Sequence, residues 1–223
     1  MNWFRAAWLV ARKDFSIELK TREITLTSSF FALLVVLASA LALPIDERDP
    51  RPIAAGTIWI TVAFSAILIA SRSWAREREE EALKGLLLAP IPRGAIYAGK
   101  ALASFVFLVF IEAITLPIVF LLFHIDWNTA LLGVLAVLGL GSGGLVLTST
   151  LFGAMTVQTR ARDLLLSVAV FPLILPALLA SAVATREVIG GESTLIGWLK
   201  VLLAYDVIVA LFAVLAFGWL LDE

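Results

Sequence analysis

The sequence contains no cysteine and a single histidine among its 223 residues. Without cysteine the chain cannot form a disulfide, a thiolate metal site or a cysteine nucleophile. With His124 as its one histidine, and Met1 and Met155 as its only methionines, the chain cannot assemble a two-histidine, Cys/His or four-cysteine centre by itself. Because no nucleophile–base pair or paired carboxylates stand out either, nothing in the sequence indicates an enzyme, and we expect no cofactor bound by this chain by itself.

Charged residues are also scarce. Asp, Glu, Lys and Arg make up 16% of the chain and hydrophobic residues 61%, with a mean hydropathy of +1.00. Soluble domains are roughly 45–50% apolar, and a chain of this size could not bury the excess in its own core. The composition therefore indicates a membrane protein. The net charge of −1 gives no sign of a nucleic-acid partner.

Long apolar windows divide the chain into repeated membrane crossings. A spanning helix needs about 20 apolar residues, and six windows qualify, at residues 24–44, 53–71, 101–123, 129–157, 164–185 and 199–221. We predict an all-α, polytopic fold with six transmembrane helices, forming a single domain over residues 1–223.

The distribution of Lys and Arg predicts the orientation of these helices. The segment before the first span and the loops after the second and fourth spans hold thirteen of these residues, whereas the alternate loops hold four. Because basic loops stay on the cytoplasmic side, we expect both termini in the cytoplasm and the protein in the cell inner membrane.

The first 22 residues read as a helix lying on the inner membrane surface. Apolar residues recur at helical spacing on one side of residues 2–20, and basic residues occupy another side, which is typical of interfacial helices. The apolar set is Phe4, Trp8, Ala11, Phe15 and Leu19, and the basic set is Arg5, Arg12, Lys13 and Lys20. Two roles fit this pattern, a topology anchor and a docking site for a partner.

One short cytoplasmic loop, residues 72–100, concentrates the remaining charge. The stretch 71–100 holds 10 of the 35 charged residues of the chain. Opposite charges four residues apart, at Arg76 with Glu80 and Glu80 with Lys84, predict a helix over residues 74–88, which Pro90 and Pro92 end. We interpret it as a helix that docks into a soluble motor subunit, with candidate coupling residues Arg76, Glu77, Glu80, Glu81, Leu86, Leu87 and Leu88.

Two glycine patterns resemble nucleotide-binding motifs but stand in the wrong context. Residues 94–101 nearly match a P-loop, yet Ala101 replaces the hydroxyl residue and a span follows. We expect Gly99 and Lys100 to mark the point where span three enters the membrane. Residues 139–144 match G-x-G-x-x-G inside span four, where Gly139 and Gly143 favour close helix packing. Bending between two transport states is a second interpretation.

Two acidic residues fall within spans. Glu112 lies near the middle of span three and Asp206 in the outer half of span six. A charge at the centre of a span costs at least roughly 2.5–3.5 kcal/mol, so such groups normally face protein or water. Glu112 fits either a polar path or an acid that fixes helix packing. We expect Arg186 to be able to neutralise Asp206.

At the charged loop the chain resembles the permease subunits of type 2 ABC exporters, which have six spans, an N-terminal amphipathic helix and a coupling helix between spans two and three. More narrowly, the whole chain resembles the CcmB family, the haem exporter B proteins of cytochrome c maturation. The similar segments are residues 53–59, 86–90 with Lys100, and 164–176, whose prolines Pro172 and Pro176 we assign to helix packing. Some members have Asp-Gly-Ser where residues 81–83 are Glu-Ala-Leu, so only the general coupling role carries over.

The resemblance implies a permease subunit that couples ATP hydrolysis in a partner to haem delivery or to release of a haem chaperone. It implies a CcmA-like ABC ATPase, a CcmC-like haem-handling membrane protein and a CcmE-like chaperone as partners, with ATP and haem bound on them. Two alternatives stay open. One is a permease of a type 2 exporter of lipid, drug or glycan, and the other is a membrane enzyme that uses Glu112.

Overall fold

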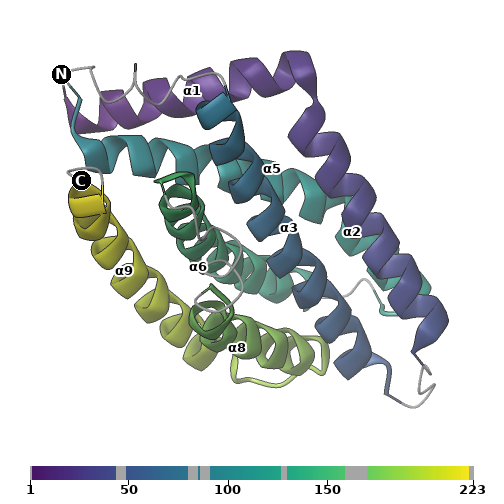
Figure 1. Cartoon of the computed structure of the whole chain (residues 1–223). Helices are drawn as coiled ribbons and strands as arrows, with labels where there is room; N and C mark the ends of the chain where they lie inside the picture. The colour runs from purple at the N-terminus through teal and green to yellow at the C-terminus, as the bar shows by residue number, and fades with distance from the viewer. Residues whose placement is uncertain are drawn as a thin grey trace.

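The computed structural model describes residues 2–43, 49–79, 85, 91–126, 130–158 and 170–220. Those residues form seven long helices and no strand (Figure 1). The helices are α1 (Trp3–Thr21), α2 (Glu23–Ala42), α3 (Arg51–Glu79), α5 (Arg93–Leu122), α6 (Ala130–Gln158), α8 (Phe171–Ile189) and α9 (Leu195–Leu220). The all-α fold predicted from the sequence is confirmed.

All helices except α1 are long and apolar enough to cross a membrane, which gives six candidate spans in the described part of the chain. The six predicted windows correspond to these helices in order. The protein is therefore a multi-pass membrane protein. Residues 164–169, at the start of the predicted fifth window, lie outside the described residues.

Two boundaries differ from the prediction because helices continue through charged sequence. Span two does not end at Ser71; α3 runs without a break to Glu79, so the first residues of the predicted coupling helix belong to α3. Likewise α5 begins at Arg93, directly after Pro92, and Lys100 lies two turns inside it rather than at its start. Charged residues can remain in these helices because acids and bases from other helices pair with them, as described below.

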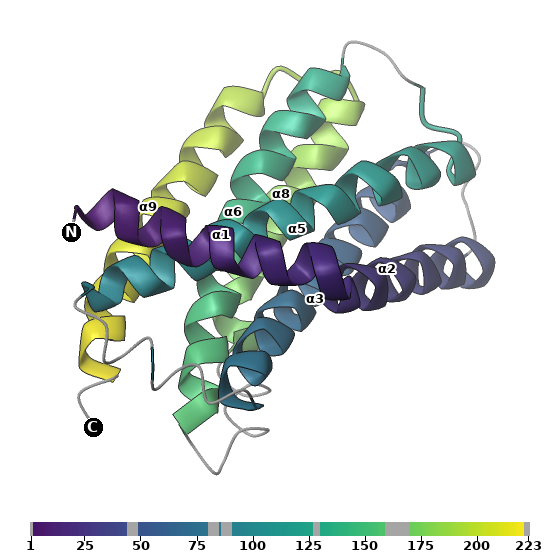
Figure 2. The ribbon, with the colours of Figure 1, turned by 90° about the horizontal axis from the view of Figure 1, so that it is seen from above.

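The chain changes direction at one residue between α1 and α2. Arg22 adopts a left-handed conformation with φ 55°, and its N–H donates to the Glu18 carbonyl at 2.7 Å, which closes the last turn of α1. Its own carbonyl already accepts from the Leu26 N–H at 3.0 Å, so α2 starts at once. As a result α1 lies across the bundle and packs along α5, while α2 descends beside α3 (Figures 1 and 2).

The contact between α1 and α5 depends on small residues. Ala6 and Ala7 of α1 pack against Ala95 of α5. A Cβ at Gly99 would lie 2.7 Å from the Cβ of Val10 and would also contact the Ala7 carbonyl. Gly99, the glycine of the P-loop-like pattern, therefore lets two helices approach closely.

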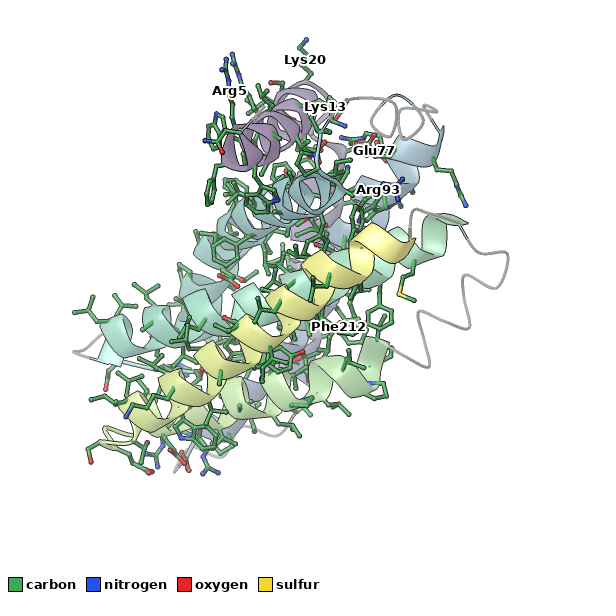
Figure 3. The ribbon with its side chains drawn as sticks, turned by 90° about the vertical axis from the view of Figure 1, so that its left-hand side faces the viewer. Arg5, Lys13, Lys20, Glu77, Arg93 and Phe212 are labelled. Atoms are coloured by element: carbon green, nitrogen blue, oxygen red, sulfur yellow. The ribbon has the colours of Figure 1, made fainter. Side chains whose placement is uncertain are left out.

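Helix α6 lies inside the bundle, where it packs against α3, α5, α8 and α9. The main core cluster joins these helices with buried residues such as Trp59, Leu108, Val137 and Ile174. By contrast, α2 and α9 have mostly exposed apolar surfaces, as the outward-pointing Phe212 of α9 shows (Figure 3). A membrane helix that contacts few neighbours turns this surface toward lipid or another subunit.

Candidate functional site

A buried group of charged residues lies where α1, α3 and α5 meet. Its centre is Lys100 of α5, whose side chain is 1% exposed. The Lys100 Nζ lies 2.8 Å from Glu77 Oε1 of α3 and 3.1 Å from Asp14 Oδ2 of α1. It also donates to Ser73 Oγ at 3.1 Å and lies 5.1 Å from the centre of the Trp74 ring. One lysine thus joins three helices that are distant in sequence.

A second lysine completes this centre. Lys13 of α1 pairs with Glu77 and, at 3.3 Å, with Asp14 Oδ1. Figure 3 shows Lys13 and Glu77 directed toward each other, between α1 and the end of α3. Burial by itself would lower the pKa of Lys13, but Asp14 and Glu77 outweigh burial and raise that pKa, so Lys13 stays protonated. Two cations and two carboxylates therefore neutralise one another.

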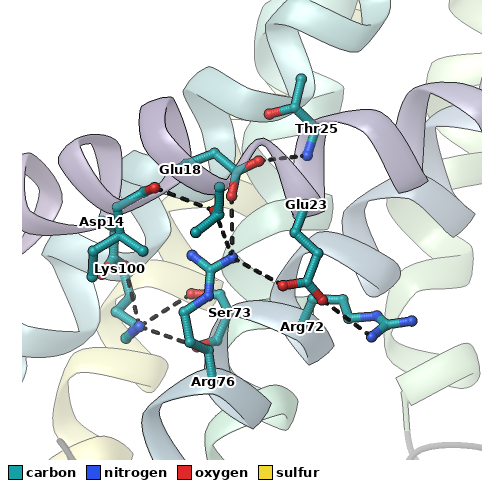
Figure 4. A network of polar contacts seen from close by, with 10 residues as sticks. Asp14, Glu18, Glu23, Thr25, Arg72, Ser73, Arg76 and Lys100 are labelled. Carbon is teal, nitrogen blue, oxygen red and sulfur yellow. Dashed lines mark hydrogen bonds and ion pairs between the residues drawn. The ribbon is translucent and has the colours of Figure 1, made fainter. Parts of the chain in front are cut away.

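Arg76 extends the ion pairs toward α2. Its Nη2 lies 3.3 Å from Glu18 Oε2 and 3.7 Å from Glu23 Oε2, and Arg72 also approaches Glu23 at 3.6 Å (Figure 4). The other carboxylate oxygen of Glu18 accepts from the Thr25 N–H at 2.7 Å, at the start of α2. Glu18 thus holds the turn between α1 and α2 and the end of α3 together.

We call this set the ionic network. It contains four acids and four bases from four helices, namely Lys13, Asp14, Glu18, Glu23, Arg72, Arg76, Glu77 and Lys100. Formal charge within it is balanced. Breaking one buried pair typically costs about 3–5 kcal/mol because the partner charge is left uncompensated, so the network fixes the relative positions of these helices.

The network lies at both ends of the predicted coupling segment. Glu77 is 3% exposed, and so its carboxylate links helices instead of lying on the surface for a soluble partner. Arg76 is half-buried and directed toward α1 and α2. The other predicted coupling residues, Glu80, Glu81, Leu86, Leu87 and Leu88, lie outside the described residues.

Sequence reasoning missed three of the four acids of the network, Asp14, Glu18 and Glu23. Asp14 and Glu18 lie on the face of α1 that also carries Ala7 and Ala11, at spacings of three and four residues. Acids within an otherwise apolar helix face are a detectable signal, because a buried carboxylate requires a partner. That partner, Lys100, is 86 residues away from Asp14 and could not be identified from the pattern.

Within the bundle, Glu112 of α5 is buried and pairs with α6. The Ser142 hydroxyl donates to Glu112 Oε1, and both side chains are buried. This bond satisfies one carboxyl oxygen and fixes α5 against α6.

Asp206 of α9 lies against the glycines of α6. A Cβ at Gly143 would lie 3.2 Å from Asp206 Oδ2, and a Cβ at Gly144 would lie 2.5 Å from Oδ1 and 2.8 Å from the Tyr205 ring. Arg186, the partner expected from the sequence, does not pair with Asp206; its charge acts on Asp49 and Glu187 instead. That expectation was wrong because Arg186 is near the end of α8, on the last turn of the helix.

Four consecutive residues of α6 therefore receive side chains from four helices. Gly141 lies against Trp59 of α3 and Ser181 of α8, Ser142 binds Glu112 of α5, and the next two glycines lie against α9. Successive residues point about 100° apart around a helix, so this run contacts every direction at one level. We call residues 141–144 and these partners the polar layer.

The four residues predicted to pack helices together differ in their surroundings. Nothing lies within 4 Å of a Cβ built at Gly139, whereas Gly143 contacts Asp206. Pro172 lies in the first turn of α8 and Pro176 inside it. Between them, the Leu173 carbonyl accepts a hydrogen bond from the Tyr205 hydroxyl at 2.7 Å, which joins α8 to α9.

His124 lies exposed just beyond the end of α5, with φ 54°. Within the described ranges, no group of three His, Asp or Glu side chains is arranged to hold a metal ion.

Comparison with known proteins shows the family to which the chain belongs. A family model described as CcmB protein matches residues 5–222. The chain is 34% identical over 135 residues to the heme exporter protein B of Paracoccus denitrificans, which covers 60% of this chain and 62% of that protein. It is 30% identical over 159 residues to the heme exporter protein B of Rhodobacter capsulatus, covering 71% of this chain and 72% of that protein.

Proposed function

Because the chain belongs to the CcmB protein family, we propose that it is the membrane permease subunit of an ABC transporter complex for cytochrome c biogenesis. The names of its relatives support a role in haem export. ATP is bound and hydrolysed on a CcmA-like partner, and haem is carried by CcmC-like and CcmE-like partners. The protein lies in the inner membrane with both termini in the cytoplasm, as the excess of basic residues on that side predicts.

The ionic network is the observation that supports coupling to an ATPase. The segment 80–92 is bounded by α3, which carries Arg76 and Glu77, and by α5, which carries Lys100. Both boundaries are tied to α1 through Glu18 and Asp14. When the ATPases close, they push on this segment, and the buried ion pairs make α1, α3 and α5 move together as a rigid body.

In this proposal the chain transmits movement from the ATPase to the spanning helices and does not itself catalyse a reaction. A push at the end of α3 travels along one uninterrupted helix from Glu79 to Arg51, and along α5 to Glu112 in the polar layer. There α6 contacts α3, α5, α8 and α9 at one level, so movement of the first two helices shifts the others. In this way the free energy of ATP hydrolysis drives either release of the haem-loaded chaperone or delivery of haem.

Affinity purification from native membranes tests the assignment of the complex. We expect the tagged full chain to retain an ABC ATPase together with a CcmC-like protein, identified by mass spectrometry. Recovery of an ATPase without CcmC would favour the exporter of lipid, drug or glycan, and recovery of no ATPase would contradict both.

Arg76→Gln tests the transmission step in the reconstituted complex. Removing this charge leaves Glu18 without its ion pair to α3 and leaves Glu23 with Arg72 as its only ion-pair partner on α3 among the described residues. We expect the amount of chaperone released per ATP hydrolysed to fall about 10-fold, while the ATPase stays bound. Lys200→Gln, which removes an exposed charge from the start of α9, is the matched control. Equal release by Arg76→Gln and the control would exclude the network as the transmission path.

A further inference from the structure

Helix α1 has three different faces. The first, with Ala6, Ala7, Val10, Asp14 and Glu18, is buried against the bundle. The second carries large apolar side chains that the bundle leaves uncovered, with Phe4 75%, Trp8 55% and Leu19 77% exposed. We call this face, which carries two aromatic residues and Leu19, the aromatic face.

The third face, which we call the basic face, carries Arg5, Arg12 and Lys20. At 100° per residue it adjoins the aromatic face on the side away from the bundle. All three side chains are exposed, and none makes an ion pair with another described residue. Figure 3 shows Arg5 and Lys20 directed outward from α1, in contrast to Lys13, which turns inward to Glu77.

We propose that α1 binds anionic phospholipids, with the aromatic face inserted among the acyl chains and the basic face holding the phosphate headgroups. This inference does not depend on the proposed function, because lipid binding can be measured without an ATPase or haem.

The position of α1 supports a lipid partner. Phe15 lies beside the aromatic face and stacks edge to face on Phe107 of α5 with ring centroids 5.4 Å apart. The apolar surface of α1 therefore continues directly onto that of a spanning helix, whose exposed residues include Val106 and Phe110. Because spanning helices are surrounded by lipid, the aromatic face meets the acyl chains and the basic face meets the headgroup level.

Charge complementarity selects anionic lipids. The basic face extends along α1 from Arg5 to Lys20, on the order of 20 Å at 1.5 Å per residue. Each basic residue near an anionic surface strengthens binding about 5-fold, so three together give on the order of 100-fold. The four acids of the ionic network do not oppose this attraction, because the four bases of the same network neutralise them.

Lipid binding at α1 also acts on the other face of the same helix. Asp14 and Glu18 hold Lys100 and Arg76 from that face. An anionic lipid therefore stabilises the helix that supplies three of the eight residues of the ionic network, and we expect it to raise the thermal unfolding midpoint.

The test uses the full-length chain, delipidated in neutral detergent, and titrated with phosphatidylglycerol or with phosphatidylcholine of the same acyl chains. We expect phosphatidylglycerol to bind on the order of 100-fold more tightly, as counted by native mass spectrometry, and the difference to shrink at high salt. The triple variant Arg5→Gln, Arg12→Gln, Lys20→Gln should bind both lipids equally.

Two controls keep the test decisive. Arg12→Gln should weaken phosphatidylglycerol binding about 5-fold, whereas Lys200→Gln, which removes an exposed charge near the start of α9, should leave it unchanged. The unfolding midpoint of the triple variant without lipid should equal that of the wild type, since these side chains are exposed and form no ion pair with another described residue. A preference for phosphatidylglycerol that survives in the triple variant, or that Lys200→Gln reduces equally, would overturn the proposal.

Discussion

At the scale of single residues, the balance of charge around Lys100 is the feature with the largest consequence. Its ammonium is shared by Glu77 and Asp14, and the same carboxylates bind Lys13. A buried charge is tolerated only with a partner, because removal from water costs several kcal/mol per ion. Each of these four side chains is therefore required by the other three.

Replacing Lys100 with Met tests this dependence. The variant keeps the apolar stem but leaves Asp14 and Glu77 with Lys13 alone, and we expect a loss of about 3–5 kcal/mol in the free energy of unfolding. Lys200→Met, an exposed site, should change it by less than about 0.5 kcal/mol. Thermal unfolding in detergent measures both, and adding Glu77→Gln to Lys100→Met should recover part of the loss. Equal stability of the two lysine variants would contradict the ionic network.

The ion pairs of Lys13 should make the stability of the protein fall at alkaline pH. Asp14 and Glu77 raise its pKa above the ordinary value of 10.5 in the folded state. Its contribution is therefore fully present below pH 10.5 and is lost as the pH rises through the folded-state pKa. We expect Lys13→Gln to have a lower thermal unfolding midpoint than the wild type at pH 8. The difference between the two midpoints should become smaller as the pH rises above 10.5. A difference that stays constant up to pH 12 would contradict the charge pairing.

At the scale of elements, α6 organises the membrane part through its glycines. Glycine is the least favourable residue in a helix apart from proline, yet this helix carries glycines at positions 141, 143 and 144 in succession around the polar layer. The structure supplies the reason, since Trp59, Tyr205 and Asp206 occupy the space that side chains there would need.

Alanine substitutions at two glycines of α6 separate packing from helix propensity. At Gly144 a Cβ would clash with Asp206 and Tyr205, and overpacking of this kind costs about 1–3 kcal/mol. At Gly139 nothing lies within 4 Å, so alanine should stabilise the helix by about 0.5–1 kcal/mol. The two variants should shift the thermal midpoint in opposite directions. A shift of the same sign and size would show that the glycines of α6 do not differ in packing.

At the scale of the whole molecule, α1 joins the membrane bundle to the segment where a partner would push. Its buried face carries acids for α3 and α5, and its other faces carry aromatic and basic side chains. The proposed mechanism requires this helix, and the loop 72–100 with it, to be on the cytoplasmic side.

The absence of native cysteine makes the orientation directly measurable. Asn2→Cys and Asp126→Cys introduce single thiols at exposed positions before α1 and after α5. We expect a membrane-impermeant maleimide added to intact spheroplasts to label Asp126→Cys and to spare Asn2→Cys until the membrane is permeabilised. The reverse pattern would invert the orientation and remove the ATPase from the proposed side.

The sequence by itself determined the class of protein and the six spans, because apolar length and composition act locally and need no knowledge of neighbours. The family came from the resemblance of segments such as residues 53–59 and 164–176 to the CcmB proteins. The sequence also identified Arg76 and Glu77, which lie in the ionic network, as candidate functional residues. Only the tertiary structure decided their partners. Lys100 with Asp14, Glu112 with Ser142 and Asp206 with Gly144 are pairs of residues far apart in the chain. The spacing of apolar residues along a helix shows which of its faces must be buried. Only the packing of the helices decides which side chain or glycine of another helix contacts that face.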